Sequence, residues 1–420
     1  MLFSFGLRSS LLLPFVMPGL VAALWLLGRG WRRGTPTDGL LALLILLPTL
    51  NVAQWMLGYA GWYDSHDGYS TTMFYVPWQL GLALGPAYYL YFRSLTNQEF
   101  RLRPLRRHLG PGLAQLALFG AAALYDLLWL RGLRGQPLPE HYGTKGPAAV
   151  ALDALSTPLA LLGYALLLGY GLRMLADYRR YRRYLDDNFS DPERLRFSGL
   201  RQLLLLQLTW LGLNLLYTGL DAVLGPFSYD EAWNFFALRG GLIYGLIVVG
   251  IQANYAAASS PLRFDAAPAP VPPAAELPPV VLAVEAAPAA AAAALAPAPV
   301  AAAELTPELL ALREKLLTLM ATEQPWLEPE LSLTELAHRL KAAPAQLSRT
   351  INAGCGQNFN DFVNSYRVRA AAARLADPRF AHYSLIGVAL DCGFNSKSTF
   401  NRVFKKLMGH PPNEVARPKS

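Results

Sequence analysis

The stretch from residue 393 to residue 406, GFNSKSTFNRVFKK, combines side chains that can contact nucleic acid. Its apolar residues recur at helical spacing and would bury one face of a helix, namely Phe400, Val403, Phe404 and Leu407. The opposite face carries Ser398, Arg402 and Lys405, flanked by Lys397, Thr399, Asn401 and Lys406. Arg and Asn can bond base edges and Lys can meet phosphates. A charged helix face is more often only solvated. Whether this helix is expected to bind DNA therefore depends on the elements next to it.

The elements before this stretch predict two helix-turn-helix units. In the first unit, Ser332 and Glu335 form a capping box that opens a helix over 332–340, and Pro344 starts a second helix over 344–352. Its inward positions are Leu347 and Ile351, and its outward positions are Ala345, Ser348, Arg349 and Asn352. A single long helix over 358–377 joins this unit to the next.

The second unit has the same outline. Ser384 caps a helix over 385–391, and CGF forms the turn, in which Gly393 is free to take a positive φ. Asn395 is expected to cap the next helix, which Gly409 ends. Residues 305–420 carry 15 Lys and Arg against 10 Asp and Glu, which is the sign that DNA binding requires.

These residues resemble the AraC/XylS-type transcription regulators. The matching positions of the second unit are Ile386, Ala389, Gly393, Phe394, Ser398, Phe400, Arg402, Phe404, Lys405, Gly409 and Pro412. The first unit is similar to the family's more variable half, through Leu336, Ala337, Leu347, Gly356, Phe359, Tyr366 and Arg367. The resemblance covers about residues 310–417, and the apolar front of the chain looks like a membrane-bound branch of the same family.

The resemblance implies sequence-specific DNA binding, with the two recognition helices in adjacent major-groove segments. Base-facing roles would fall on Ser348, Arg349, Lys397, Ser398, Thr399 and Arg402, and the wider expected DNA-binding set adds Asn352, Asn401, Lys405 and Lys406. Two residues depart from the family pattern. Ala343 stands where Ser or Thr often caps the first recognition helix, and Val415 replaces an aromatic residue near the last helix.

The front of the chain predicts a membrane domain. Apolar residues make up 53% of the chain and charged residues 16%, which is below the roughly 25% charge of a soluble domain. Seven apolar stretches are long enough to cross a bilayer, at about 9–28, 39–59, 73–93, 110–130, 148–172, 200–224 and 233–255. The first is read as a retained span rather than a signal peptide, because no cleavage site of the A-x-A kind ends it.

The basic residues between these spans predict their orientation. The loops after the first, third and fifth spans hold 15 Arg, whereas the opposite side holds four Arg and Lys. Short cytoplasmic loops carry the basic excess. We therefore expect a multi-pass protein of the bacterial inner (cytoplasmic) membrane, with the N-terminus outside and the C-terminal domain in the cytoplasm.

Four ionisable residues lie within or beside the spans: Asp126, Asp153, Asp221 and Arg239. In the expected orientation all four lie in the outer part of their spans. They are either near enough to water to need no partner, or they form an outward-facing polar pocket in which Arg239 pairs with Asp221 or Asp153 and helps to hold a ligand.

The resulting fold class is all-α, with a seven-helix transmembrane bundle, a linker and a cytoplasmic helical domain. The domains are expected at 1–258, 259–304 and 305–420. Residues 266–304 contain only Ala, Pro, Val, Leu and Glu, and the prolines and Glu276 exclude an eighth span. We expect a disordered Ala/Pro tether that would extend over about 35 Å as a coil.

The function expected is a membrane-anchored transcription regulator that couples a signal directly to promoter binding. The partners would be double-stranded DNA, membrane lipid, an unknown small-molecule or membrane signal, and a second copy in a homodimer. No catalytic or metal-ligand motif is present, so no enzyme activity, cofactor or metal is expected. The alternatives are a transporter or membrane enzyme with a regulatory DNA-binding tail, and a passive anchor that senses nothing.

Overall fold

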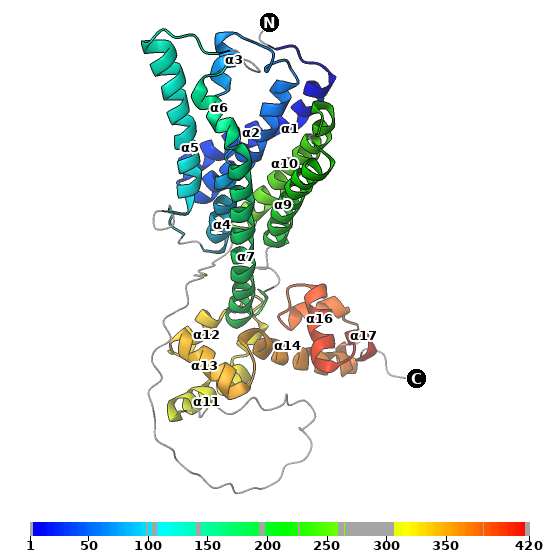
Figure 1. Cartoon of the computed structure of the whole chain (residues 1–420). Coiled ribbons are helices and arrows are strands. Elements are labelled where there is room, and N and C mark those ends of the chain that lie inside the picture. Colours follow the sequence, from blue (N-terminus) through cyan, green and yellow to red (C-terminus); the bar gives the residue numbers. More distant parts are fainter. Residues whose placement is uncertain are drawn as a thin grey trace. The chain divides into compact units, whose positions relative to one another are not determined.

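The computed structural model describes residues 3–97, 100–102, 107–139, 144–192, 198–225, 227–258, 264, 306–380 and 382–415. Within these residues the chain forms helices and no strand (Figure 1). It divides into two compact units: unit 1 is Met1–Arg179 with Phe197–Asp265, and unit 2 is Arg180–Arg196 with Ala266–Ser420. The expected tether at 259–304 lies, apart from Phe264, outside the described residues.

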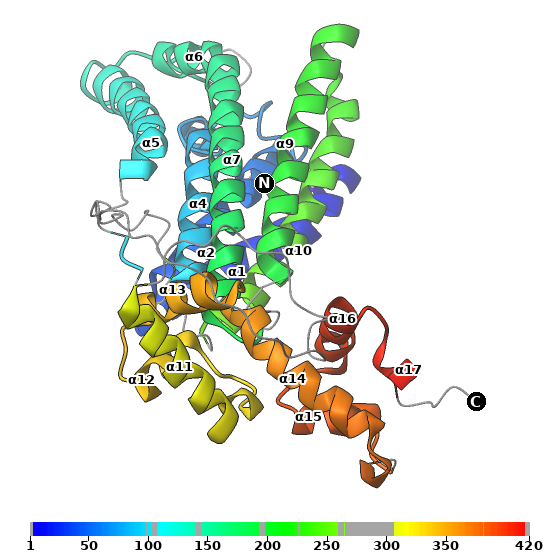
Figure 2. The ribbon, with the colours of Figure 1, turned by 90° about the horizontal axis from the view of Figure 1, so that it is seen from below.

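Unit 1 is a helical bundle. Its elements are α1 (Leu7–Arg33), α2 (Pro36–Gly58), α3 (Gly68–Met73), α4 (Gly81–Thr96), α5 (Gly110–Ala123), the π-helix η2 (Leu124–Leu133), α6 (Pro147–Ala154), most of α7 (Ser156–Asn188), α9 (Ser198–Leu224) and α10 (Tyr229–Ala258). Helix α2 packs against α1, α4 and α10 (Figure 2). Small residues allow close packing: a side chain at Gly85 of α4 would touch the backbone of α7 at Leu166.

Among the described residues, six helices of unit 1 are long and apolar enough to cross a membrane, and the expectation of seven is corrected accordingly. The stretch expected as a span over 73–93 is not one helix. Helix α3 ends at Met73, and α4 begins only at Gly81 and has 16 residues. Pro77 explains the break, because proline lacks an N–H donor and disfavours helical backbone at the residue before it. Most of α4 is buried within unit 1.

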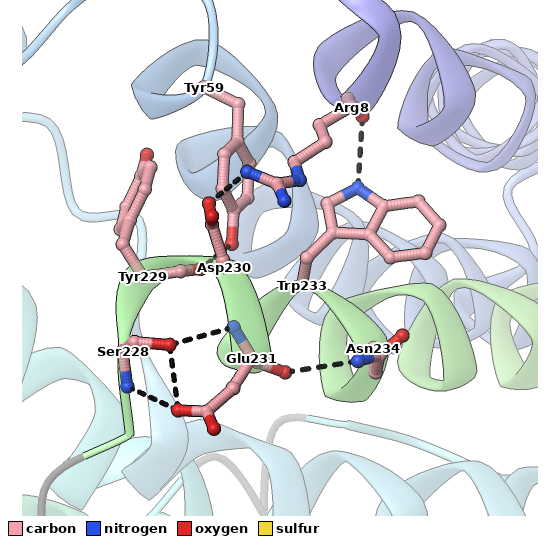
Figure 3. A network of polar contacts seen from close by, with 8 residues as sticks. All are labelled: Arg8, Tyr59, Ser228, Tyr229, Asp230, Glu231, Trp233 and Asn234. Carbon is pink, nitrogen blue, oxygen red and sulfur yellow. Dashed lines mark hydrogen bonds and ion pairs between the residues drawn. The ribbon is translucent and has the colours of Figure 1, made fainter.

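The start of α10 is fixed by a polar network (Figure 3). Ser228 and Glu231 form a capping box, in which the Glu231 carboxylate accepts from the Ser228 N–H at 2.9 Å. Arg8 of α1 pairs with Asp230, and the Arg8 carbonyl accepts from Nε1 of Trp233 at 3.0 Å. These contacts join α10 to the beginning of α1.

Unit 2 contains the two expected helix-turn-helix units. After α11 (Pro307–Thr322) and the 3₁₀ turn η3 (Pro325–Leu327), the first is made of α12 (Leu333–Arg339) and α13 (Pro344–Cys355). The connecting helix α14 (Phe359–Ala376) and the 3₁₀ turn η4 (Pro378–Phe380) lead to the second, made of α15 (Leu385–Asp391), α16 (Lys397–Met408) and α17 (Pro412–Val415).

Side-chain caps begin most of these helices, as the sequence predicts. Ser332 and Ser384 each accept the backbone N–H three residues later, as predicted, and Asn358, which was not predicted as a cap, does the same for α14. The cap of α16 is Ser396 rather than the expected Asn395. Helix α13 begins at Ala343 without a side-chain cap, as its residue type requires.

Two separate cores lie side by side in unit 2, and α14 contributes to both. Phe359, Phe362 and Val363 belong to the core of the first helix-turn-helix unit. Val368 and Ala371, further along α14, belong to the core of the second. The residues of α16 that were expected to face inward all lie in the second core or pack against it. The buried face predicted from the helical spacing of its apolar residues is therefore confirmed.

Candidate nucleic-acid interface and membrane-domain cavity

Helix α16 presents the charged face that the sequence predicts. Lys397, Ser398, Asn401, Arg402 and Lys405 are exposed, and they lie away from the buried Phe400 and Phe404. Gly393 takes φ +83° in the turn before the helix, and Gly409 takes φ +81° at its end. The helix therefore has a fixed start and end, with its cationic surface between them.

Two residues of the expected DNA-binding set have side-chain partners within unit 2. Thr399 is only 8% exposed, and its hydroxyl accepts from the Ser396 hydroxyl at 3.0 Å. Lys406 donates to both carboxylate oxygens of Asp361, at 2.7 and 2.9 Å. Thr399 is therefore less available to DNA than the exposed residues of α16, whereas Lys406 stays exposed and forms an ion pair on the surface.

Helix α13 presents a smaller polar face. Arg349 and Asn352 are exposed, and Ser348 is half-buried beside them. The Asn352 amide donates to the Ser348 hydroxyl at 3.4 Å, so the two side chains lie together on one turn of the helix. The buried partners on the inner face are Leu347 and Ile351, as expected.

Arg367 has a structural role that the sequence did not predict. It lies on α14 between the two cores and is 1% exposed. Its guanidinium donates to the carbonyls of Trp326 and Glu328, each at 2.7 Å, and lies over the Phe394 ring at 5.9 Å. Burial lowers the pKa of Arg367 to about 10, which leaves it protonated at neutral pH. Arg367 thus links the first helix-turn-helix unit to the turn of the second helix-turn-helix unit.

The comparisons with known proteins bear on this domain. Residues 336–418 match the family model described as a helix-turn-helix domain. The match shows a helix-turn-helix domain at the C-terminal end and supports the resemblance to AraC-type regulators. A stretch of 92 residues is 34% identical to the uncharacterized HTH-type transcriptional regulator YtdP of Bacillus subtilis (strain 168). That stretch is 22% of this chain and 12% of the relative. No solved structure matches the chain.

These similarities support DNA-binding transcription regulation by the C-terminal domain, and a domain of this kind points to a regulator rather than an enzyme. The family model ends within the C-terminal domain and does not extend to the apolar front of the chain. The function of that part has to be argued from its own structure.

Unit 1 contains a cavity of about 360 Å³. Part of its wall is the non-helical stretch between α3 and α4, including Phe74, Trp78 and Gln79. Gln115 of α5 holds this stretch by donating to the Gln79 carbonyl at 2.8 Å and accepting from the Leu82 N–H at 3.1 Å. Irregular backbone at membrane depth is tolerated where it is enclosed by protein or lines a cavity.

The rest of the cavity wall mixes aromatic rings with polar side chains. Its polar residues include Asn51, Gln54, Lys145, Asp153, Tyr164 and Asn214. Lys145 pairs with Asp153 at 2.6 Å. A cavity with an apolar lining and a few converging polar groups is the usual form of a small-molecule site.

Only Asp153 of the four singled-out ionisable residues lines this cavity. Asp126 is fully buried and accepts from Tyr75 and from the N–H groups of Ala148 and Ala149, so it caps the start of α6. Asp221 accepts from the N–H of Phe227.

Arg239 has aromatic and amide neighbours in place of a carboxylate. It is 5% exposed, with its Nη1 3.5 Å from the Asn51 side-chain oxygen. Its guanidinium lies over the rings of Phe236 at 4.7 Å and Tyr217 at 5.4 Å. The described ion pairs do not join it to Asp221 or Asp153, although Asn51 brings it to the edge of the cavity.

Proposed function

We propose that the chain is a membrane-anchored, one-component transcription regulator. The observation that carries the proposal is the pair of exposed polar faces on α13 and α16, which belong to one helix-turn-helix domain. Such faces can read base edges while nearby lysines meet phosphates. The regulator would act by binding promoter DNA.

Each recognition helix would contact its own segment of the DNA major groove. Ser348, Arg349 and Asn352 would contact one major-groove segment from α13. Lys397, Ser398, Asn401 and Arg402 would contact the next from α16, with Lys405 on a phosphate. Thr399 would contribute less, because its side chain is buried, and Lys406 would have to leave its ion pair with Asp361 to reach a phosphate.

Membrane anchoring is proposed from the six long apolar helices. DNA binding requires the C-terminal domain to be in the cytoplasm. An outside N-terminus then requires an odd number of crossings, so it holds only if the chain also crosses between residues 67 and 107. That crossing would consist of α4 and the non-helical stretch before it.

The cavity in unit 1 is the proposed site of the signal. Its volume suits a small molecule, and its amide and aromatic lining suits a ligand with both polar and apolar parts. In a passive anchor, by contrast, filling the cavity would have no effect on transcription. Asn214→Leu and Gln54→Leu would change the cavity and leave the helix-turn-helix domain unchanged. An altered transcriptional response would therefore support a signal site, and an unaltered response would support a passive anchor.

The decisive experiment measures DNA binding by the full chain. Genome-wide mapping of DNA bound by the tagged protein would supply an operator, and salt titrations on that operator would follow. Arg402→Ala should cost about 1–3 kcal/mol and relax the preference at one base pair. Lys405→Ala should weaken binding to all sequences alike and reduce the salt slope by about one unit.

The matched control is Lys315→Ala, which removes one positive charge from the exposed surface of α11. It should leave sequence preference unchanged. If Arg402→Ala and Lys315→Ala had equal effects on operator and random DNA, the proposed role of α16 in base reading would be wrong.

A further inference from the structure

The three residues that follow α7 pack into unit 2. Helix α7 runs as one continuous helix to Asn188, and the chain from Arg180 to Arg196 belongs to unit 2. Phe189 forms an antiparallel bridge with Ser332, the cap of α12. The N–H of Ser190 donates to the Leu331 carbonyl at 3.2 Å. This three-residue segment, Phe189–Asp191, is called the docking segment below.

Ser190 is held by α14. Its carbonyl accepts from the Asn360 amide at 2.7 Å and lies 3.5 Å from the Asn364 amide. Its hydroxyl accepts from Arg367 at 3.2 Å. The three partners are spaced four and three residues apart, so they form one polar stripe on the helix. Ser190 is 1% exposed, and the stripe therefore encloses it.

Asp191 extends the contact to the second helix-turn-helix unit. Its carboxylate accepts from the Asn395 amide at 3.0 Å, and Asn395 also donates to the Pro329 carbonyl at 3.1 Å. Asn395 directly precedes Ser396, the cap of α16. The docking segment thus contacts the start of α12, the connecting helix and the start of α16.

We propose that Phe189–Asp191 is an intramolecular docking segment that holds the two recognition helices in a state of low DNA affinity. The Asp191 carboxylate lies beside the start of α16, where it adds negative charge next to residues that would approach phosphates. Removing the segment from the stripe would release α14 and α16 together. A shift along α7 would then change DNA affinity without a separate signalling protein.

The first test detects the docking itself. Residues bridged across an antiparallel pair have Cα atoms about 4.5–5.5 Å apart, within the roughly 4.4–6.8 Å range of a disulfide. Phe189→Cys with Ser332→Cys would be made in the full chain, with Cys355→Ser and Cys392→Ala removing the native thiols. A site-specific protease site inserted between residues 266 and 304 would then be cut.

The oxidised pair should keep the two fragments joined on a non-reducing gel, and reduction should separate them. The control pairs Phe189→Cys with Thr318→Cys, which lies on the exposed surface of α11. Fragments joined equally in both pairs, or in neither, would overturn the docking. This result does not depend on DNA, so it stays valid even if the proposed DNA binding fails.

The second test rests on the proposed function and measures operator affinity of the full chain in lipid nanodiscs. Asp191→Asn should raise affinity about tenfold, a typical size for coupling between sites. Asp187→Asn makes the same charge change one turn earlier and should have a much smaller effect. The oxidised chain that carries Phe189→Cys and Ser332→Cys should keep low affinity, and its reduction should raise affinity.

Equal affinity gains from Asp191→Asn and Asp187→Asn would show that the loss of any nearby negative charge raises the affinity for DNA. This result would overturn the inhibitory role. So would an oxidised pair that binds the operator as tightly as the reduced one. If no variant bound DNA at all, the proposed function would fail and the inhibitory role would fall with it, whereas the disulfide result would still decide the docking.

Discussion

Gly393 is the position where the contact between the two helix-turn-helix units can be tested most directly. Its φ of +83° is a left-handed conformation, which costs an alanine about 1–2 kcal/mol. A Cβ there would also lie 2.5 Å from the Trp326 carbonyl oxygen and 2.9 Å from that of Leu327. Both are backbone atoms that cannot turn away, and such overpacking costs about 1–3 kcal/mol. Gly393→Ala should therefore destabilise the domain by about 2–5 kcal/mol.

Gly409 supplies the matched control. Its φ of +81° is almost the same, but a Cβ there would meet nothing within 4 Å. Gly409→Ala should therefore cost only the backbone term of about 1–2 kcal/mol. The difference in unfolding free energy between the two variants measures the contribution of the close packing of the second helix-turn-helix unit against η3.

Urea unfolding of residues 305–420 would measure both values. Trp326 is the single tryptophan in this fragment and lies at the contact, so its fluorescence reports the transition. A typical domain has about 5–15 kcal/mol of stability, so Gly393→Ala could remove a large share of it. Equal losses in the two glycine variants would refute the argument that packing against η3 fixes the second unit.

Two further predictions concern unit 1. A reporter active only in the cytoplasm should work when fused after Arg107, Arg183 or Ser260 and should fail after Asp67 or Gly143; equal activity at Asp67 and Arg107 would mean that α4 does not cross the membrane. Arg239→Gln should alter the transcriptional response to signal more than Asp221→Asn, because Arg239 reaches the cavity through Asn51 whereas Asp221 only accepts from Phe227. Equal responses at unchanged membrane levels would contradict a role for Arg239 in the cavity.

The helix-turn-helix domain could be predicted from sequence because its signals are short-range. A cap, a proline at the first turn and a glycine at the end act within four residues, and Ser332 and Ser384 act as expected. The error at α16 has the same origin. Asn395 and Ser396 are both capable caps, and the choice depends on tertiary partners of Asn395 that lie at Asp191 and Pro329.

Unit 1 was predicted less well because hydropathy measures composition and not helix continuity. The window over 73–93 is apolar, but Pro77 interrupts it and the resulting short helix is covered by its neighbours. The same limit applies to the candidate DNA-binding face. Lys406 belongs to the charged side of α16 by spacing, and its partner Asp361 comes from a helix 45 residues earlier.

The separation of the two cores supports the proposed regulation through a segment as small as Phe189–Asp191. Each helix-turn-helix unit has its own buried cluster, so neither unit alone determines where the other lies. What remains is α14, the close approach at Gly393 and the guanidinium of Arg367. Arg367 bonds the first unit, lies over Phe394 of the second and also donates to Ser190. A change at Ser190 therefore acts on a polar junction between the two recognition helices, while both cores stay intact.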